Sequence, residues 1–138
     1  MFIWKKEFEL GIKSIDEQHK KLLELGNKIN DLLVYHDEND DNYDEIYEVI
    51  EELRAYTVYH FSTEEELFLK YNYLEYKQHK KEHDDFILFL KTINPEDIDN
   101  NQKEFLKKLL AKIVQWVFKH IITTDFLYKD YLIKLGMN

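Results

Sequence analysis

The stretch His60-Phe61-Ser62-Thr63-Glu64 carries two side chains that can act together. An α-helix turns by about 100° per residue, so residues four positions apart lie nearly above one another on one face. On a helix, His60 and Glu64 offer an imidazole nitrogen and a carboxylate oxygen to the same point in space. Taken alone, such a pair is more typical of a buried histidine beside a surface glutamate than of a functional site.

The same arrangement recurs along the chain. His79 and His83 are again four residues apart, and Asp125 follows His120 by five. His19 lies on the apolar face of the first predicted helix. Five of the six histidines, with two carboxylates, therefore fall in four predicted helices.

The composition favours one helical domain, residues 1–138. Of the 138 residues only 3 are Gly and 1 is Pro, while 44% are hydrophobic and 15% aromatic, which is enough to bury a core. The absence of cysteine excludes disulfides, thiolate zinc sites and cysteine-held iron–sulfur clusters. The net charge of -9 argues against a nucleic-acid partner. No apolar run reaches the ~20 residues that span a bilayer, and the N-terminus does not resemble a signal peptide. We therefore expect a cytoplasmic protein without membrane insertion.

Four long helices are predicted from apolar residues at helical spacing. They run from a Ser14–Glu17 capping box to about Tyr35, from Asn42 or Tyr43 to Asn72, from about Glu75 to Ile93, and from about Asn101 into a C-terminal helical extension that ends near Gly136. Residues 1–13 form an apolar N-terminal arm. Short connections favour antiparallel neighbours, so the predicted fold is all-α, an antiparallel up-down-up-down four-helix bundle.

Some details of this pattern are less regular. Pro95 is expected to end the third helix, with a polar loop after it. Glu65 falls off the apolar stripe and is expected in solvent, and His36 is expected at the surface near a helix end. On an ideal helix Asp125 lies about 140° from His120, so we expect a local distortion, or a carboxylate that reaches sideways.

Buried polar groups need partners. An unpaired buried group costs about 1–3 kcal/mol, and a lone carboxylate costs more. Five inward histidines and two inward carboxylates therefore indicate a metal site, the alternative being a buried hydrogen-bond network. Nitrogen-rich ligands without sulfur suit Fe, Zn, Cu or Ni. Two six-coordinate ions have about 12 coordination positions in total. Five imidazoles fill one position each, whereas two bridging carboxylates and one bridging oxygen fill two each, so about one position stays open for an external ligand.

The sequence resembles the hemerythrin family in its single-domain bacterial form. The matching residues are Trp4, Ile15-Asp16-Glu17-Gln18-His19, His60-Phe61-x-x-Glu64-Glu65, His79-x-x-x-His83 and Trp116-x-x-x-His120-Ile121-x-x-x-Asp125. The resemblance covers nearly the whole chain. Phe68 and Leu74 stand where the family often has Met and Pro; neither is at a ligand position.

The resemblance implies reversible O2 binding at a non-haem di-iron centre, with a role as oxygen carrier, store or supplier and not as an enzyme. One iron ion (Fe2+/Fe3+) would bind His79, His83 and His120, and the other His19 and His60. Glu64, Asp125 and an oxo or hydroxo group would bridge the two ions. O2 would bind end-on at the open iron as a hydroperoxide, and azide or nitric oxide are further candidate ligands. The family's dry O2 pocket maps to Leu22, Phe61, Trp116, Val117 and Ile121.

Other functions remain open at this point. A ferritin-like di-iron oxidase would need Glu-x-x-His pairs, which do not occur; the nearest spacing is Asp16-x-x-His19. A metal phosphohydrolase could use His83 and Asp84, but adjacent residues point about 100° apart on a helix. A sensor of O2, redox state or nitric oxide that acts through a docked partner would use the same residues as a carrier.

Overall fold

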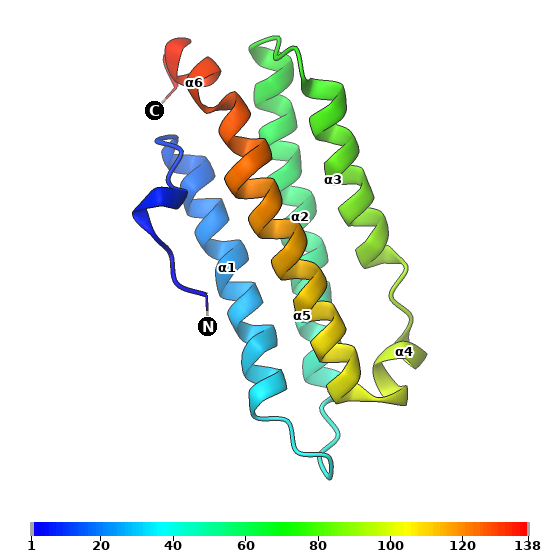
Figure 1. Ribbon diagram of the computed structural model, residues 1–138. Coiled ribbons are helices and arrows are strands. Elements are labelled where there is room, and N and C mark those ends of the chain that lie inside the picture. The colour runs from blue at the N-terminus through cyan, green and yellow to red at the C-terminus, as the bar shows by residue number, and fades with distance from the viewer. Residues whose placement is uncertain (1, 138) are drawn as a thin grey trace.

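The spacing of apolar residues produces four long antiparallel helices, as predicted (Figure 1). The computed structural model describes residues 2–137. Its long helices are α1 (Lys13–Val34), α2 (Tyr43–Lys70), α3 (Tyr76–Lys91) and α5 (Gln102–Lys119). Shorter elements are the 3-10 turn η1 (Lys6–Phe8), α4 (Pro95–Asn100), the π-helical turn η2 (His120–Asp125) and α6 (Phe126–Lys134). The N-terminal arm runs beside α1, and α6 continues α5 at the end of the bundle (Figure 1).

The apolar core is divided into two clusters. The larger contains Leu22, Phe61 and Ile121, and the smaller contains Ile15 and Phe68. Along α1, the buried His19 lies between Ile15 of the smaller cluster and Leu22 of the larger one. A polar layer is therefore enclosed between two apolar clusters, which limit the access of water to it along the bundle.

The start of α1 differs from the predicted capping box. The helix begins at Lys13, and its cap residue makes no side-chain hydrogen bond. Instead, the Asp16 carboxylate accepts hydrogen bonds from the backbone N–H groups of Leu10, at 2.8 Å, and Gly11, at 3.1 Å. Gly11 has a φ of 87°, a left-handed conformation that costs glycine little. Asp16 therefore fixes the turn of the arm to α1. A capping motif describes contacts within the helix only, so it does not predict this contact with the arm.

The rest of the arm is attached further along α1. The backbone N–H of Phe2 donates to the Asn27 side-chain oxygen at 2.6 Å, and the Asn27 amide donates back to the Phe2 carbonyl at 2.9 Å. The Phe2 ring lies beside Gly26 and beside Phe118 of α5. Trp4 is half-buried. The arm thus covers the seam between α1 and α5.

The segment expected to be a loop after the third helix contains the short helix α4. Pro95 is its first residue, where a missing N–H and a fixed φ are favourable. Asn94 and Asp97 form a reciprocal capping box around it. The prediction of a loop here was wrong because Pro95 starts a helix and does not merely end the previous one.

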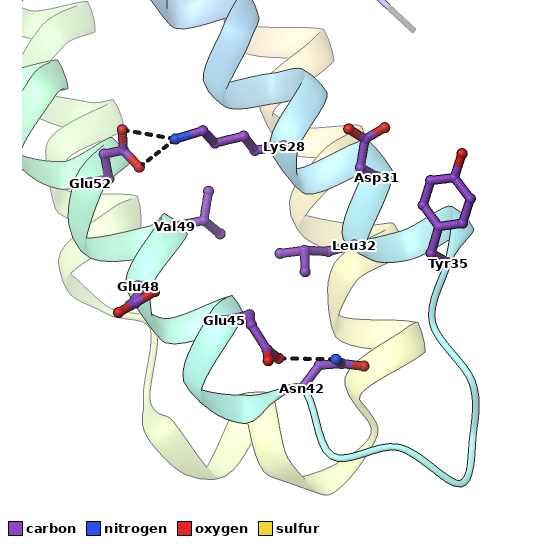
Figure 2. A pocket seen from close by; sticks show the side chains of 9 residues that line it. All are labelled: Lys28, Asp31, Leu32, Tyr35, Asn42, Glu45, Glu48, Val49 and Glu52. Atoms are coloured by element: carbon purple, nitrogen blue, oxygen red, sulfur yellow. Dashed lines mark hydrogen bonds and ion pairs between the residues drawn. The ribbon is translucent and has the colours of Figure 1, made fainter.

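Between residues 2 and 137 the structure contains no helix that is long and apolar enough to cross a membrane. A surface groove of about 410 Å³ lies between α1 and α2 and is lined by Lys28, Asp31, Leu32, Tyr35, Asn42, Glu45, Glu48, Val49 and Glu52 (Figure 2). Lys28 lies nine residues beyond His19, or about 14 Å along the helix. The polar layer is thus separate from this groove.

Candidate metal centre

A π-helical turn brings the last pair of candidate ligands together. The turn η2 starts at His120 and ends at Asp125, and both side chains are buried. One extra residue in the turn offsets the rotation that would place these residues on different faces of an α-helix. The nearest His120 Nε2 and Asp125 oxygen atoms are 3.1 Å apart. The expected local distortion is therefore confirmed.

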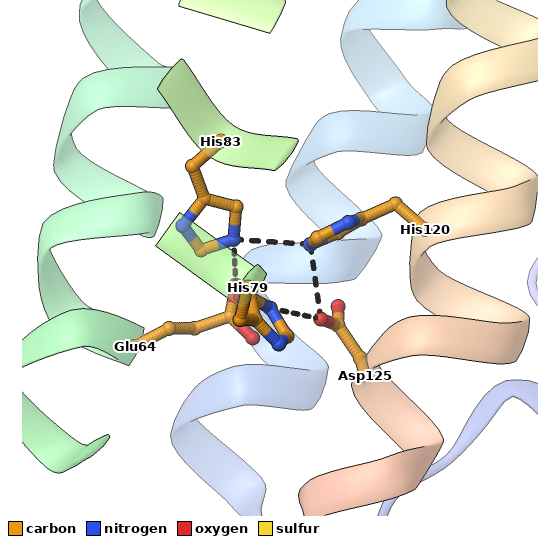
Figure 3. A group of neighbouring side chains, drawn as sticks. All are labelled: Glu64, His79, His83, His120 and Asp125. Atoms are coloured by element: carbon orange, nitrogen blue, oxygen red, sulfur yellow. Dashed lines mark hydrogen bonds and ion pairs between the residues drawn. The ribbon is translucent and has the colours of Figure 1, made fainter. Parts of the chain in front are cut away.

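All seven predicted ligand residues converge inside the bundle in two overlapping groups. Within each group, one donor atom from every residue lies within 4.8 Å of the others. The three-histidine group contains His79, His83 and His120 with Glu64 and Asp125 (Figure 3). The two-histidine group contains His19 and His60 with the same two carboxylates. This is the division that the resemblance implies for two ions.

The two shared carboxylates face both groups in different ways. The Asp125 Oδ2 atom lies 3.0 Å from His19, and its Oδ1 atom lies 2.9 Å from His79. Each oxygen of Asp125 thus faces one group. Glu64 instead directs one oxygen, Oε1, at His60 at 3.0 Å and at His83 at 3.3 Å. Its other oxygen accepts a hydrogen bond from the buried Tyr128 hydroxyl.

The candidate ligand atoms lack the hydrogen bonds that buried polar atoms normally make. Among the residues that the structure describes, the following central atoms are buried without a hydrogen-bond partner: His19 Nε2, His60 Nε2, His79 Nε2, Glu64 Oε1 and both Asp125 oxygens. The short contacts between these atoms do not have hydrogen-bond geometry, and an unsatisfied buried polar atom costs about 1–3 kcal/mol, so a network closed on itself would be unfavourable. Cations satisfy all of these atoms at once. Imidazole and carboxylate donors fit iron, so these residues are suited to holding it.

The electrostatics of the centre favour ionised carboxylates. Burial opposes ionisation, yet the adjacent His120, His19 and His79 hold the pKa of Asp125 well below its usual range. Burial and the negative charge of Asp125 also oppose ionisation of Glu64, but His60 and His83 still lower its pKa. Two buried negative charges therefore persist at neutral pH, which suits a site for divalent cations.

The imidazoles respond differently to the same surroundings. Burial lowers the pKa of His60, an effect that outweighs the attraction of Glu64. Burial also opposes protonation of His83, but its contacts with Glu64 and Glu65 raise its pKa to about 9. His60 is therefore neutral and free to act as a ligand, whereas a cation must displace a proton from His83.

Sequence reasoning missed the residues that hold the outer nitrogens of the histidines. Gln18 Oε1 lies 2.7 Å from His60 Nδ1, and Glu65 Oε2 lies 2.8 Å from His83 Nδ1. The expectation that Glu65 is solvated was wrong, because its side chain is only 18% exposed and turns toward α3. Helical periodicity shows which face a residue occupies but not how far a long side chain reaches across to a neighbouring helix.

The residues expected to line an O2 pocket all belong to the larger apolar cluster or pack against it. Leu22, Phe61, Val117 and Ile121 are buried, and Trp116 is half-buried. The Phe61 ring stacks on His83 with centroids 3.8 Å apart, and Trp116 stacks on His120 at 4.4 Å. These two aromatic rings thus cover the three-histidine group directly, and their role toward O2 stays a prediction.

A four-helix bundle with a buried, histidine-rich centre of this kind defines a class of metal-binding proteins. The profile of the Hemerythrin HHE cation binding domain matches residues 10–132 of the chain. A bacteriohemerythrin of Clostridium acetobutylicum is 41% identical over 133 residues, which is 94% of this chain and 100% of the relative. A hemerythrin-like protein of Naegleria gruberi is 34% identical, over 95% of this chain and 93% of that one.

The solved structures agree with the sequence comparison. A crystal structure of wild-type hemerythrin superimposes with a TM-score of 0.77 at 25% identity, covering 94% of this chain and 96% of the other. This chain belongs to the hemerythrin family, as its resemblance implied.

Proposed function

We propose that this protein binds O2 reversibly at a pair of non-haem iron ions, as an oxygen carrier, store or supplier. The observation that carries this proposal is the pair of overlapping donor groups that share Glu64 and Asp125. The ligands are His19, His60, Glu64, His79, His83, His120 and Asp125. Membership of the hemerythrin family supports an oxygen-binding role and not an enzymatic one.

When bound, the iron pair would supply the two electrons that O2 takes up reversibly. The protein's part is to hold the ions and keep water out. Asp125 and Glu64 face both histidine groups and would bridge them, with an oxo or hydroxo group as the third bridge. Apolar residues on both sides of the polar layer would exclude water and proton donors, which favours reversible binding of O2 over its irreversible reduction. End-on binding at the two-histidine position, and binding of azide or nitric oxide, belong to this proposal.

The test is anaerobic loading of the metal-free protein with Fe2+, followed by alternating exposure to air and argon. We expect about two iron ions per chain and a visible charge-transfer band that forms in air and disappears under argon. His19→Ala should abolish the band. His36→Ala is the matched control, because His36 lies outside both groups and should leave the band unchanged.

Other results would contradict the proposal. One tightly bound zinc ion per chain would exclude O2 binding at this site. Irreversible bleaching with release of peroxide, or turnover of an added substrate, would indicate an oxidase. The cytoplasmic location is also a proposal, and fractionation of the native cells would test it.

A further inference from the structure

The two groups of ligands differ in the residues that contact the outer Nδ1 atoms of their imidazoles. In the three-histidine group, His83 donates its Nδ1–H to the Glu65 carboxylate at 2.8 Å. In the two-histidine group, His60 donates its Nδ1–H to the neutral Gln18 amide oxygen at 2.7 Å. Both contacts place a proton on the outer Nδ1 and turn Nε2 toward the centre, where it can bind a cation once any proton on His83 Nε2 has been displaced. The difference between them is therefore one of charge and not of ring orientation.

A second carboxylate strengthens this difference. Glu82 Oε2 lies 3.9 Å from His120 Nδ1, and the Thr124 hydroxyl donates to the other Glu82 oxygen at 3.3 Å. His19 Nδ1 and His120 Nδ1 are both buried without a hydrogen-bond partner among residues 2–137, so Glu82 acts on His120 only through its charge at 3.9 Å. The three-histidine group thus has one hydrogen-bonded carboxylate and a second nearby, whereas the hydrogen-bonded partner in the two-histidine group is an amide.

Glu65 is held in place for this role. Its Oε1 atom lies 4.0 Å from the Lys80 ammonium, which also pairs with Asp84 at 2.8 Å. Its side chain is 18% exposed, while the neighbouring Glu66 is exposed and makes no ion pair in the described part of the chain. An imidazole that donates to a carboxylate is a more basic ligand than one that donates to an amide, and loss of such a partner typically weakens metal binding 10–100-fold.

We propose that Glu65 is a positioning residue that makes the two cation positions unequal, so that the three-histidine group binds a divalent cation before the two-histidine group. This inference rests on the proposed function, since it concerns the same centre. It adds an order of loading: the first ion is bound by His79, His83 and His120, and the second completes the pair at His19 and His60.

The test is a titration of the metal-free full-length chain with Co2+ under argon, in which calorimetry and visible absorption monitor the binding. We expect two steps in the native sequence and in the control Glu66→Gln, which makes the same change of charge one residue away. His19→Gln should remove the second step and keep the first. Glu65→Gln should weaken the first step roughly 10–100-fold and leave the second unchanged. Gln18→Glu should tighten the second step and bring the two closer together.

Two results would overturn the inference. One is a first step that is as tight in Glu65→Gln as in Glu66→Gln; the other is loss of the first step in His19→Gln. If Glu65→Gln folds poorly, the affinity of the second step in Gln18→Glu tests the inference independently. Unequal loading would survive even if the iron-loaded protein failed to bind O2, whereas absence of any Co2+ binding in the native sequence would overturn both proposals.

Discussion

At the scale of single residues, the centre depends on side chains that keep water away as well as on its ligands. Leu22 lies three residues after His19 on α1 and is 5% exposed. We predict that Leu22→Ser speeds the irreversible oxidation of the O2-bound protein, because a hydroxyl beside the centre brings water and a proton donor. The decay of the visible band in air measures this. Leu25→Ser, a change in the same core cluster, controls for general destabilisation, and equal decay in both variants would contradict the prediction.

The pKa of His83 gives a second prediction, for the metal-free protein. Its folded-state pKa is about 9, above the ordinary value of 6.5. The stabilisation from its protonated form is thus fully present below pH 6.5 and is lost as the pH rises through about 9. In urea denaturation, Glu65→Gln should lower the free energy of unfolding at pH 6 and have a smaller effect at pH 9.5. An effect independent of pH, or one matched by Glu66→Gln, would contradict this.

The sequence predicted side chains that share a face of one helix, but it did not predict the hydrogen bonds that side chains make to a neighbouring helix. His60 with Glu64, and His79 with His83, were predicted because four-residue spacing alone places them on one face. Gln18, Glu65 and Tyr128 were missed, since each acts on a histidine or carboxylate of another element. Which side chains meet across the bundle depends on the relative rotation of the helices, and no local pattern encodes that.

At the scale of elements, the antiparallel bundle and the distortion after His120 were predicted correctly. The five-residue spacing to Asp125 is incompatible with a regular helix carrying both ligands on one face, so a π-helical turn resolves it. The Ser14–Glu17 capping box was wrong because α1 starts at Lys13, with Ile12 and not Ser14 as its cap residue. The side chain that fixes this end of the helix is Asp16, which accepts hydrogen bonds from the backbone of the arm.

The packing of the arm on α1 leads to a further prediction. A Cβ added at Gly26 would lie 3.1 Å from the Phe2 ring, closer than an ordinary van der Waals contact. Within a helix Gly→Ala normally stabilises by about 1 kcal/mol. We predict that Gly26→Ala shows this gain in a Phe2→Ala background and loses most of it in the native background, because the ring must move. A double-mutant cycle of chemical denaturation measures the coupling, and additive effects would show that the ring shifts without cost.

At the scale of the whole molecule, the buried centre couples metal binding to folding. Its ligands come from α1, α2, α3 and the η2 turn, so the two ions together would link all four sides of the bundle. Metal held at a thousand times its dissociation constant adds about 4 kcal/mol to the free energy of unfolding. We predict that chelation lowers the midpoint of thermal unfolding by several degrees or more and that added Fe2+ restores it under argon. A midpoint unchanged by chelation in protein shown to have lost its metal would contradict this coupling.

The place of the ligands along the chain has a consequence for biosynthesis. His19 is near the start, and Asp125, whose two oxygens face both histidine groups, comes more than a hundred residues later. A nascent chain on the ribosome therefore lacks the carboxylate that joins the two groups until residue 125 has emerged. Complete loading must follow translation of nearly all the helices, and a truncated product that stops before η2 would lack both His120 and Asp125 and could not form either complete group of ligands.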